Sequence, residues 1–323
     1  MSLRIPLVGR ESVAVSTEPI ISYAQNHEDI VLARVFRPWE RKGFWVDIGA
    51  GDPIEDSVTA LFSSYGWRGL NVEPMSLEYE RLVKERPADI NLQVAVSNHE
   101  GTATLYCGPP ENRGMSTMDE TRGETYLRDG FTKIEVPLTT MALLSKKYLT
   151  QPVDFLKIDV EGLERSVLEG MDWTTLRPTV IVMEATLPGT RTPSHGEWED
   201  LLVANGYESV LFDGLNRYYI RRDDTNSAAL REALNAPANV FDNFVTYSLA
   251  KLREDLEQAL AHKQIEVDEA LQQLNEVRGR WEYKMATRLG RVARAVPGLV
   301  QLRQRWSKHA RRINAEPDSG KSR

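Results

Sequence analysis

Residues 43–53 read GFWVDIGAGDP, the pattern of a buried strand that runs into a glycine turn. The aromatic and β-branched residues before the turn favour a strand. Gly49 and Gly51 allow the backbone to turn tightly and to approach a ligand closely. Apolar residues then recur at helical spacing over 57–65. Strand, glycine turn and helix predict the first unit of a doubly wound nucleotide-binding fold, in which ligands bind at the carboxyl ends of the strands.

The residues around this turn narrow the choice of nucleotide. A dinucleotide fingerprint requires a third small residue, but Ile54 stands at that position, and the chain has no P-loop motif. What remains is Asp-x-Gly-x-Gly, from Asp47 to Gly51, followed by Glu73 at the end of the next predicted strand. A carboxylate there can accept hydrogen bonds from both hydroxyls of a ribose. The combination predicts S-adenosylmethionine as cofactor, whereas the glycine motif taken alone is also compatible with a plain turn.

Bulk composition limits the class of protein. The chain has 323 residues, of which 41% are apolar and 27% charged, as in soluble globular proteins of one large domain or two smaller units. The single cysteine, Cys107, excludes an intramolecular disulfide and a cysteine metal cluster, and we expect it in a strand. The sequence shows neither an apolar run of membrane-spanning length nor a signal-peptide core. A bacterial-type cytoplasm is therefore the expected location.

Charge is distributed unevenly along the chain. Residues 284–323 hold 11 Lys/Arg and 2 Asp/Glu, whereas residues 1–283 hold 29 Lys/Arg and 45 Asp/Glu. An acidic body is thus followed by a basic tail, which we expect to lie outside the catalytic core.

Apolar and β-branched runs predict the remaining strands. They cover 68–72, 91–96, 102–107, 133–138, 153–158, 179–183, 208–212 and 216–220. The last two are joined through Asp213-Gly214, a hairpin signal. With intervening helical segments, this pattern predicts an α/β fold with a mixed, mostly parallel seven-stranded sheet, helices on both faces and an antiparallel pair at one edge.

Acids follow several of these strands. Asp159 and Glu161 come after the strand at 153–158, and Glu184 ends the strand at 179–183. Each acid alone is compatible with a solvated strand end, but together with Asp47 and Glu73 they predict an acidic rim. Asp159, Glu161 and Glu184 are candidates for a general base or for ligands of a hard cation such as magnesium or calcium. A divalent cation is therefore an additional expectation.

Two polar segments lie outside the strands. In the cluster at 22–29, Asn26 is expected to cap a helix, and the cluster either serves only as a cap or faces a ligand, with Gln25 as a candidate contact. Residues 108–132 show no period, and a structureless segment of this length is usually functional. We predict a lid or acceptor-binding loop there; a disordered surface insertion is the alternative.

The C-terminal region has a different pattern. Apolar or small residues recur mostly every three, four or seven positions at Leu249, Leu252, Leu256, Leu260, Val267, Ala270, Leu274, Val277 and Trp281. They predict a coiled-coil helix for self-association or for a pathway partner, with a helix packed on its own domain as the alternative. Residues 284–312 form a basic amphipathic segment interrupted by Pro297-Gly298. It suits an anionic membrane surface or an acidic partner, or is a solvated tail; nucleic acid is not expected, because no base-reading module accompanies it.

These patterns divide the chain into four parts. We expect an N-terminal arm at 1–19, a catalytic domain at 20–247, a coiled-coil helix at 248–283 and a basic amphipathic tail at 284–323.

Four motifs resemble a known family, the FkbM-type methyltransferases. They are SYAQN-x-ED at 22–29, F-x-VDIGA-x-DP at 44–53, GWRG at 66–69 with Glu73-Pro74, and DFLKIDVEG at 154–162. The resemblance covers about 20–247, and one departure is His27, where the family often has glycine. It implies a Rossmann-like class I methyltransferase fold and O-methylation by S-adenosylmethionine, often of sugar or polyketide hydroxyls. The C-terminal helix and tail lie outside the pattern, although similar helical extensions occur on some polysaccharide-pathway enzymes.

The resemblance and the residue patterns together give a set of expected site residues. Asp159, Glu161 and Glu184 are the expected catalytic residues. The expected cofactor contacts are Gln25, Asp47, Gly49, Ala50, Gly51, Asp52, Glu73, Ala95 and Val96. The expected acceptor is a hydroxyl group of a sugar in a polysaccharide, a glycolipid or a glycosylated natural product, and the enzyme is expected in the cytoplasm or at the inner face of the membrane. The alternatives are a non-catalytic, cofactor-binding assembly factor that works through the coiled coil, and an oxidoreductase, which the failed dinucleotide fingerprint disfavours.

Overall fold

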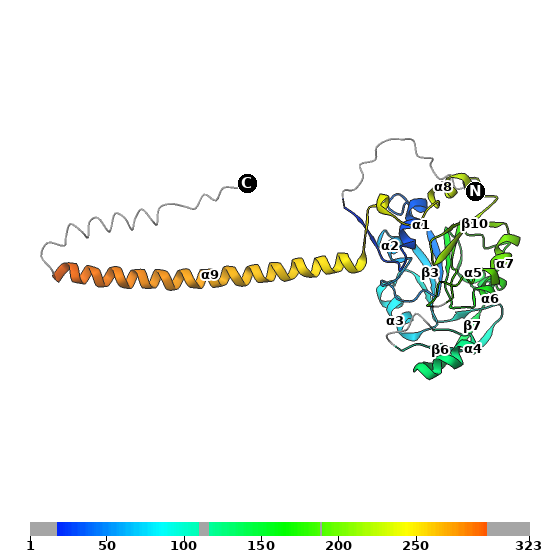
Figure 1. The fold of residues 1–323 in the computed structure, drawn as a ribbon, viewed down its shortest axis with the longest axis horizontal. Helices are drawn as coiled ribbons and strands as arrows, with labels where there is room; N and C mark the ends of the chain where they lie inside the picture. Colours follow the sequence, from blue (N-terminus) through cyan, green and yellow to red (C-terminus); the bar gives the residue numbers. More distant parts are fainter. Residues whose placement is uncertain (1–17, 110–115, 188, 296–323) are drawn as a thin grey trace. The chain divides into compact units, whose positions relative to one another are not determined.

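The computed structural model describes residues 18–109, 116–187 and 189–295 (Figure 1). The chain divides into two compact units, Met1–Ala250 and Lys251–Arg323. Nearly all of the expected arm at 1–19 and the tail beyond residue 295 lie outside the described residues.

A seven-stranded mixed sheet forms the centre of the first unit. Its strand order is β10-β11-β9-β8-β2-β3-β4. Strands β9, β8, β2, β3 and β4 pair in parallel, and β11 is antiparallel to both of its neighbours, β9 and β10. The bounds are β2 Phe44–Ile48, β3 Arg68–Val72, β4 Ile90–Leu92, β8 Phe155–Ile158, β9 Val180–Glu184, β10 Tyr207–Phe212 and β11 Asn216–Arg221. This confirms the predicted Rossmann-like sheet with its antiparallel edge. The quoted glycine strand, β2, lies between β3 and β8, so its carboxyl end is at the middle of the sheet.

Helices cover both faces of this sheet, and each layer closes its own apolar core. One core joins Val46 and Ile48 of β2 to α5, α6 and α7; the other joins Trp45 of β2 to α1, α2 and α8. The two faces are used alternately because successive strand side chains point to opposite sides. The helices of the first unit are α1 Glu28–Phe36, α2 Ala60–Ser64, α3 Ser76–Glu85, α4 Glu120–Tyr126, α5 Met141–Tyr148, α6 Glu164–Glu169, α7 Glu199–Ala204 and α8 Ser227–Ala233, with short 3-10 turns at η2 Leu127–Asp129, η3 His195–Glu197 and η4 Val240–Asp242.

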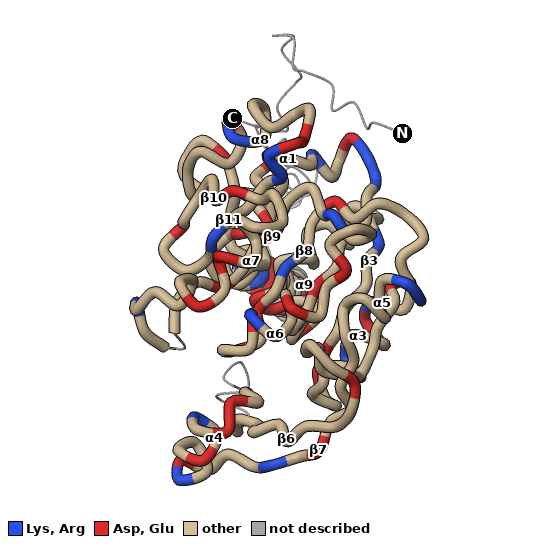
Figure 2. Tube along the Cα trace, turned by 90° about the vertical axis from the view of Figure 1, so that its right-hand side faces the viewer, with Lys and Arg blue, Asp and Glu red and all other residues tan. Residues whose placement is uncertain are grey.

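A second, three-stranded sheet corrects the prediction of one strand at 91–96. The chain leaves the main sheet after β4, and β5, Ala95–Val96, pairs instead with β7, Thr132–Thr139, which also pairs with β6, Gly101–Cys107. The whole run is apolar enough for one strand, so the change of sheet leaves no local signal. Figure 2 shows β6 and β7 together with α4 at one end of the unit.

The segment at 108–132 is not structureless, which corrects a second expectation. Among its described residues, α4 and η2 form a short helical stretch. The helix begins because the Asp119 side chain accepts the backbone N–H of Arg122 at 3.0 Å. Five of its seven residues are polar, and this small apolar content explains why no helical period is visible in the sequence.

The start of the first unit is tied to its end. Strand β1, Ile20–Ser22, pairs in parallel with β12, Phe244–Thr246, and Tyr23 stacks on Tyr247 with 5.1 Å between ring centroids. The expected cap at Asn26 is wrong: the N-cap of α1 is His27, with φ of 63° and no side-chain capping bond. His27 instead approaches Ser22 Oγ at 3.0 Å through its Nδ1 atom.

The second unit contains most of one long helix. Helix α9 runs without interruption from Tyr247 to Ala295 (Figure 1). Within the described residues, the structure contains no helix with the length and apolarity that crossing a membrane requires.

Candidate functional site

The glycine turn after β2 is held by backbone hydrogen bonds to β3. The N–H groups of Gly49 and Ala50 both donate to the carbonyl oxygen of Val72, at 3.0 and 3.1 Å. Gly49 has φ of 77°, and any Cβ there would overlap the carbonyl oxygen of Asp159. Glycine is therefore required at this position by both its conformation and the close approach of β8.

Glu73 lies beside the turn, as expected from its position after β3. Its Oε2 accepts the N–H of Gly51 and its Oε1 accepts the N–H of Met75, both at 2.8 Å. Burial raises the pKa of this carboxyl to about 7, and the two backbone donors only partly oppose this. Because each carboxylate oxygen has two lone pairs, both oxygens keep the capacity to accept a second hydrogen bond.

Asp47 lies directly before the glycine turn, but its side chain is buried. Its side chain is 1% exposed, accepts the hydroxyl of Thr59 at 3.3 Å and lies 3.6 Å from Lys157 Nζ. Burial raises the pKa of Asp47, and the positive charges of Lys157 and Arg86 partly offset this. The buried position gives Asp47 a supporting place under the turn.

Lys157 is a candidate functional residue that the sequence analysis missed. Its ammonium group donates to the carbonyl oxygen of Gly49 at 2.8 Å and lies 3.2 Å from Asp159 Oδ2. Burial alone would lower its pKa, but Asp159 and Asp47 outweigh burial and raise the pKa, so the group is charged. A lysine inside the apolar run FLKI was the available signal, because lysine is almost never buried without a partner.

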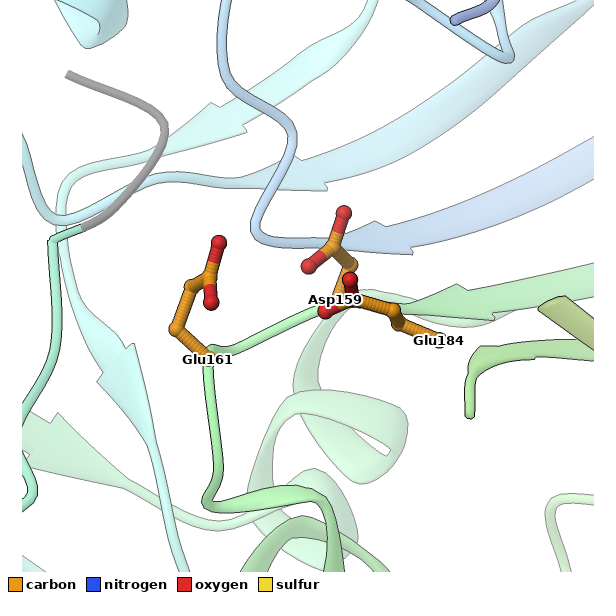
Figure 3. Close-up of side chains that lie close together, drawn as sticks. All are labelled: Asp159, Glu161 and Glu184. Carbon is orange, nitrogen blue, oxygen red and sulfur yellow. The ribbon is translucent and has the colours of Figure 1, made fainter. Parts of the chain in front are cut away.

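The three expected catalytic acids come together at the ends of β8 and β9. Asp159, Glu161 and Glu184 each offer a carboxylate oxygen, and these atoms lie within 4.8 Å of one another (Figure 3). Burial, followed by the negative charge of Asp159, raises the pKa of both Glu161 and Glu184. Three carboxyl groups this close cannot all ionise easily, so the cluster is suited to hold a proton near neutral pH.

Glu161 has an unusual backbone that is held from a distant segment. Its φ is 55°, a left-handed conformation that costs a non-glycine residue about 1 to 2 kcal/mol. Its carbonyl oxygen accepts hydrogen bonds from Thr117 Oγ1 at 2.9 Å and from Arg122 Nη1 at 3.3 Å. Its own Oε2 is buried without a hydrogen-bond partner among the described residues. Strain of this kind is found at functional sites, where the surroundings hold it in place.

The remaining expected contacts are less directly placed. Gln25 is exposed, and an isolated bridge between Ala24 and Asp56 brings its segment beside the chain that follows the glycine turn. Asp52 accepts the backbone N–H of Ile54 at 2.9 Å and forms an ion pair with Arg81, so its carboxylate already has partners. Ala95 and Val96 are buried in β5, which belongs to the second sheet. They follow β4 of the main sheet in the chain, and this connection is their link to the site.

Comparisons with known proteins give the family of this chain. The model of the methyltransferase FkbM domain matches residues 47–209. A search of curated proteins found no match.

Three solved structures are similar at low identity. An FkbM methyltransferase from Methylobacillus flagellatus KT is 14% identical over 55% of this chain and 43% of its own, with a TM-score of 0.34. A TehB-like SAM-dependent methyltransferase from Corynebacterium glutamicum is 9% identical over 60% and 87%, with a TM-score of 0.35. An O-methyltransferase from Bacillus cereus, in complex with SAH, is 13% identical over 63% and 84%, with a TM-score of 0.31.

The family match alone spans half of the chain, and it includes the glycine turn, Glu73 and the three clustered acids. In contrast, this chain covers less than half of the Methylobacillus flagellatus chain. The sequence match over the site shows that the chain belongs to the FkbM methyltransferase domain family.

Proposed function

We propose that this protein is an O-methyltransferase that uses S-adenosylmethionine to methylate a hydroxyl group of a sugar in a polysaccharide, a glycolipid or a glycosylated natural product. The observation that carries the proposal is the position of the acid cluster. Lys157 bonds both the glycine turn, through Gly49, and the cluster, through Asp159, so a cofactor turn and a proton acceptor lie side by side.

The residues around the turn fit this cofactor. Open space lies beside Gly51, where a Cβ would meet no atom within 4 Å and where φ is 59°. Glu73 keeps a free lone pair on each oxygen, which suits the two hydroxyls of a ribose. We assign the turn at 49–51 and Glu73 to cofactor binding, Gln25 and Asp52 to its entrance, and Ala95 and Val96 to the adenine side. Asp47 supports the turn from below.

Bound at this turn, S-adenosylmethionine supplies a methyl group on a sulfonium centre, which is already strongly electrophilic. The chain's own contribution is to orient an acceptor hydroxyl and to remove its proton. We assign the proton to the cluster of Asp159, Glu161 and Glu184. Glu161 fits best as acceptor, because its Oε2 has no partner among the described residues and burial raises its pKa, which makes its ionised form a stronger base.

A divalent cation at this cluster stays a prediction of the sequence. The three carboxylates are hard oxygen donors of the kind that magnesium and calcium prefer. However, Lys157 already places a positive charge 3.2 Å from Asp159, so part of the negative charge is balanced without an ion. Activity that survives exhaustive chelation would remove the cation from the mechanism.

Acceptor binding is assigned to the segment that contains α4. Thr117 precedes this helix, Arg122 lies in its first turn, and both contact the backbone carbonyl of Glu161. An acceptor bound against α4 would therefore lie close to the proposed base. The sugar class itself rests on the family resemblance.

Calorimetric titration with S-adenosylhomocysteine tests the cofactor. We expect micromolar binding to the wild type, and for Glu73→Ala a loss of about 2 to 4 kcal/mol of binding free energy, because two charge-assisted hydrogen bonds disappear. The matched control is Glu80→Ala, which removes an exposed acid of α3. Equal binding by wild type and Glu73→Ala would remove Glu73 from the cofactor site.

Methyl transfer to a panel of sugars, glycolipids and phenols tests the reaction. With cofactor labelled in its methyl group, a product that carries the label on a sugar oxygen supports the proposal. An enzyme that binds the cofactor and methylates an amine or a thiol, but no hydroxyl in the panel, would contradict the proposal. A chain that binds the cofactor and transfers no methyl group would favour the assembly-factor alternative.

A further inference from the structure

One face of α9 carries exposed apolar side chains along its whole length. They are Leu249, Leu252, Leu256, Leu260, Val267, Leu271, Leu274, Trp281, Met285, Leu289 and Val292, and their exposures run from 40% to 69%. We call these eleven residues the α9 stripe. At 100° per residue they fall within an arc of about 100°. An apolar surface of this length is rarely left exposed and usually marks an interface.

The stripe runs straight along the helix. A strict heptad repeat drifts around an ideal helix by about 20° per seven residues, but the α9 stripe ends at Val292 on the same side on which it begins at Leu249. Its spacing is thus close to the 3.6 residues of a straight helix. A partner that covers it should lie alongside with little supercoiling.

The order of the stripe is the same in both directions. Leu249 corresponds to Val292, Leu252 to Leu289, Leu256 to Met285, Leu260 to Trp281 and Val267 to Leu274, and the eleventh residue, Leu271, corresponds to the small apolar Ala270. The two members of every pair lie at equal distances from the point between Ala270 and Leu271. This is the pattern that a two-fold axis requires, because each surface residue must then meet its counterpart on an identical chain.

Charge gives the orientation independently. Residues 249–270 hold three Lys/Arg and six Asp/Glu, whereas 271–292 hold five Lys/Arg and two Asp/Glu. The two halves therefore carry net charges of −3 and +3. A parallel pair would place like charges together, whereas an antiparallel pair places each acidic half against a basic half, which favours association.

We propose that α9 is an antiparallel homodimerisation helix, in which two copies of this chain pair through the α9 stripe about an axis between Ala270 and Leu271. This goes beyond the proposed methyltransferase activity and does not depend on it. The pairing separates the two copies of Leu249 by about 65 Å at 1.5 Å per residue.

The register also identifies its weakest layer. Lys263 and Arg278 occupy stripe positions that face each other across the axis. Each already has a partner on its own helix, Glu266 at 2.7 Å for Lys263 and Glu282 at 3.1 Å for Arg278. Replacing both by leucine should therefore tighten the dimer, by about tenfold or more.

Cysteine cross-linking of the full chain tests the orientation. Leu252→Cys and Leu289→Cys chains, one of them with a size tag, are mixed and mildly oxidised. We expect a mixed disulfide between the two variants and no disulfide in Leu252→Cys alone, because two copies of residue 252 would lie about 55 Å apart. The wild type, whose single cysteine Cys107 is buried, is the control.

A disulfide between two Leu252→Cys chains would establish a parallel pair and overturn the proposal. So would a wild-type chain that sediments as a monomer at 50 µM, whether or not it binds anionic vesicles. Leu274→Glu tests the stripe itself: two symmetric layers lose an apolar contact, so the dissociation constant should rise about a hundredfold or more. Gln272→Glu adds the same charge outside the stripe and should change it by less than about threefold; equal effects of both variants would contradict the stripe.

Discussion

Two acids of the first unit, the buried Asp29 and the half-buried Glu161, differ in how their oxygens are used. Asp29 is 0% exposed and accepts hydrogen bonds from Ser22 Oγ and from the backbone N–H groups of Tyr23, Ala24 and Ile30, at 2.6 to 3.4 Å. Glu161 has a buried Oε2 without a partner among the described residues, and its backbone is in the left-handed region.

The contrast separates an acid that we expect to be structural from one that we propose to act in the chemistry. The carboxylate oxygens of Asp29 accept hydrogen bonds within the turn that precedes α1, so removing Asp29 should lower stability. Glu161 is held in place through its carbonyl oxygen, which leaves its carboxyl group available, so removing that carboxyl should cost turnover. Sequence position alone does not show this difference, because both acids stand in motifs of the same family.

The largest expected effect is on turnover. Glu161→Gln should lower the rate of methyl transfer about 100- to 10,000-fold, because an amide cannot accept the proton of the acceptor hydroxyl. The midpoint of thermal unfolding should stay the same or rise, since a repelling buried acid is removed. Exposed Glu197 offers the control Glu197→Gln, which should be active.

Asp159→Asn should likewise abolish turnover while leaving affinity for S-adenosylhomocysteine within a few fold. Cofactor binding lost together with turnover would move Asp159 from chemistry to binding. A Glu161→Gln enzyme within threefold of wild type would place the proton acceptor at Glu184 or Asp159 instead.

The next effect is on stability. Asp29→Asn should lower the free energy of unfolding by about 3 to 5 kcal/mol, because the amide nitrogen cannot accept the donors that now point at a carboxylate oxygen. Urea unfolding measures this, and the folded fraction should keep wild-type affinity for S-adenosylhomocysteine. A stability loss below about 1 kcal/mol would show that the turn does not depend on these hydrogen bonds.

A third effect depends on pH and concerns Glu28, which neighbours Asp29. Burial raises the pKa of Glu28 to about 7, above its ordinary value of roughly 4.3. The folded chain therefore binds this proton more tightly than the unfolded chain, so stability is full below the unfolded pKa and is lost as pH rises through the folded pKa. From pH 4.5 to 8 this one group should lower stability by roughly 3 kcal/mol.

Glu28→Gln isolates this contribution, since an amide does not titrate. The difference in unfolding free energy between variant and wild type should shift in favour of the variant by roughly 2 to 3 kcal/mol between pH 4.5 and 8. The control is Glu100→Gln, at an exposed acid in a turn, which should show no such shift. A pH-independent difference for Glu28→Gln would contradict the raised pKa.

The smallest effect tests how Glu161 is positioned. Thr117→Val keeps the shape of the side chain but removes the 2.9 Å hydrogen bond to the Glu161 carbonyl oxygen. A loss of about 1 kcal/mol should lower kcat about fivefold and leave cofactor affinity unchanged, and Thr117→Ser should restore most of the rate. If Thr117→Val instead lowers only thermal stability, this contact is structural.

Much of the site could be predicted because its signals are local. The alternation of the GFWVDIGAGDP stretch, its two glycines and the acids at three strand ends are properties of short segments, and parallel strands bring their carboxyl ends to one edge. The main sheet and the meeting of Asp159, Glu161 and Glu184 followed from this rule. The hairpin at Asp213-Gly214 was equally local.

The errors concern features that depend on distant contacts. The run at 91–96, NLQVAV, has no turn residue that would mark a break, and only pairing with β7 divides it between two sheets. Helix α4 lacks an apolar period because it is short and mostly polar. His27, rather than Asn26, is the N-cap of α1, next to a turn in which the Ser22 hydroxyl contacts both His27 and Asp29.

The sequence by itself determined where most strands lie, the glycine turn and the candidate acids. It also determined that the α9 stripe is straight and has the same order in both directions. Each of these depends on residue type and spacing along one element. Only the tertiary structure decided that Lys157 links the turn to the acids and that Thr117 and Arg122 hold Glu161. It also decided that both carboxylate oxygens of Asp29 accept hydrogen bonds, whereas Oε2 of Glu161 accepts none among the described residues. These depend on residues that are far apart in the chain, and hydrogen bonding and burial act through space rather than along the sequence.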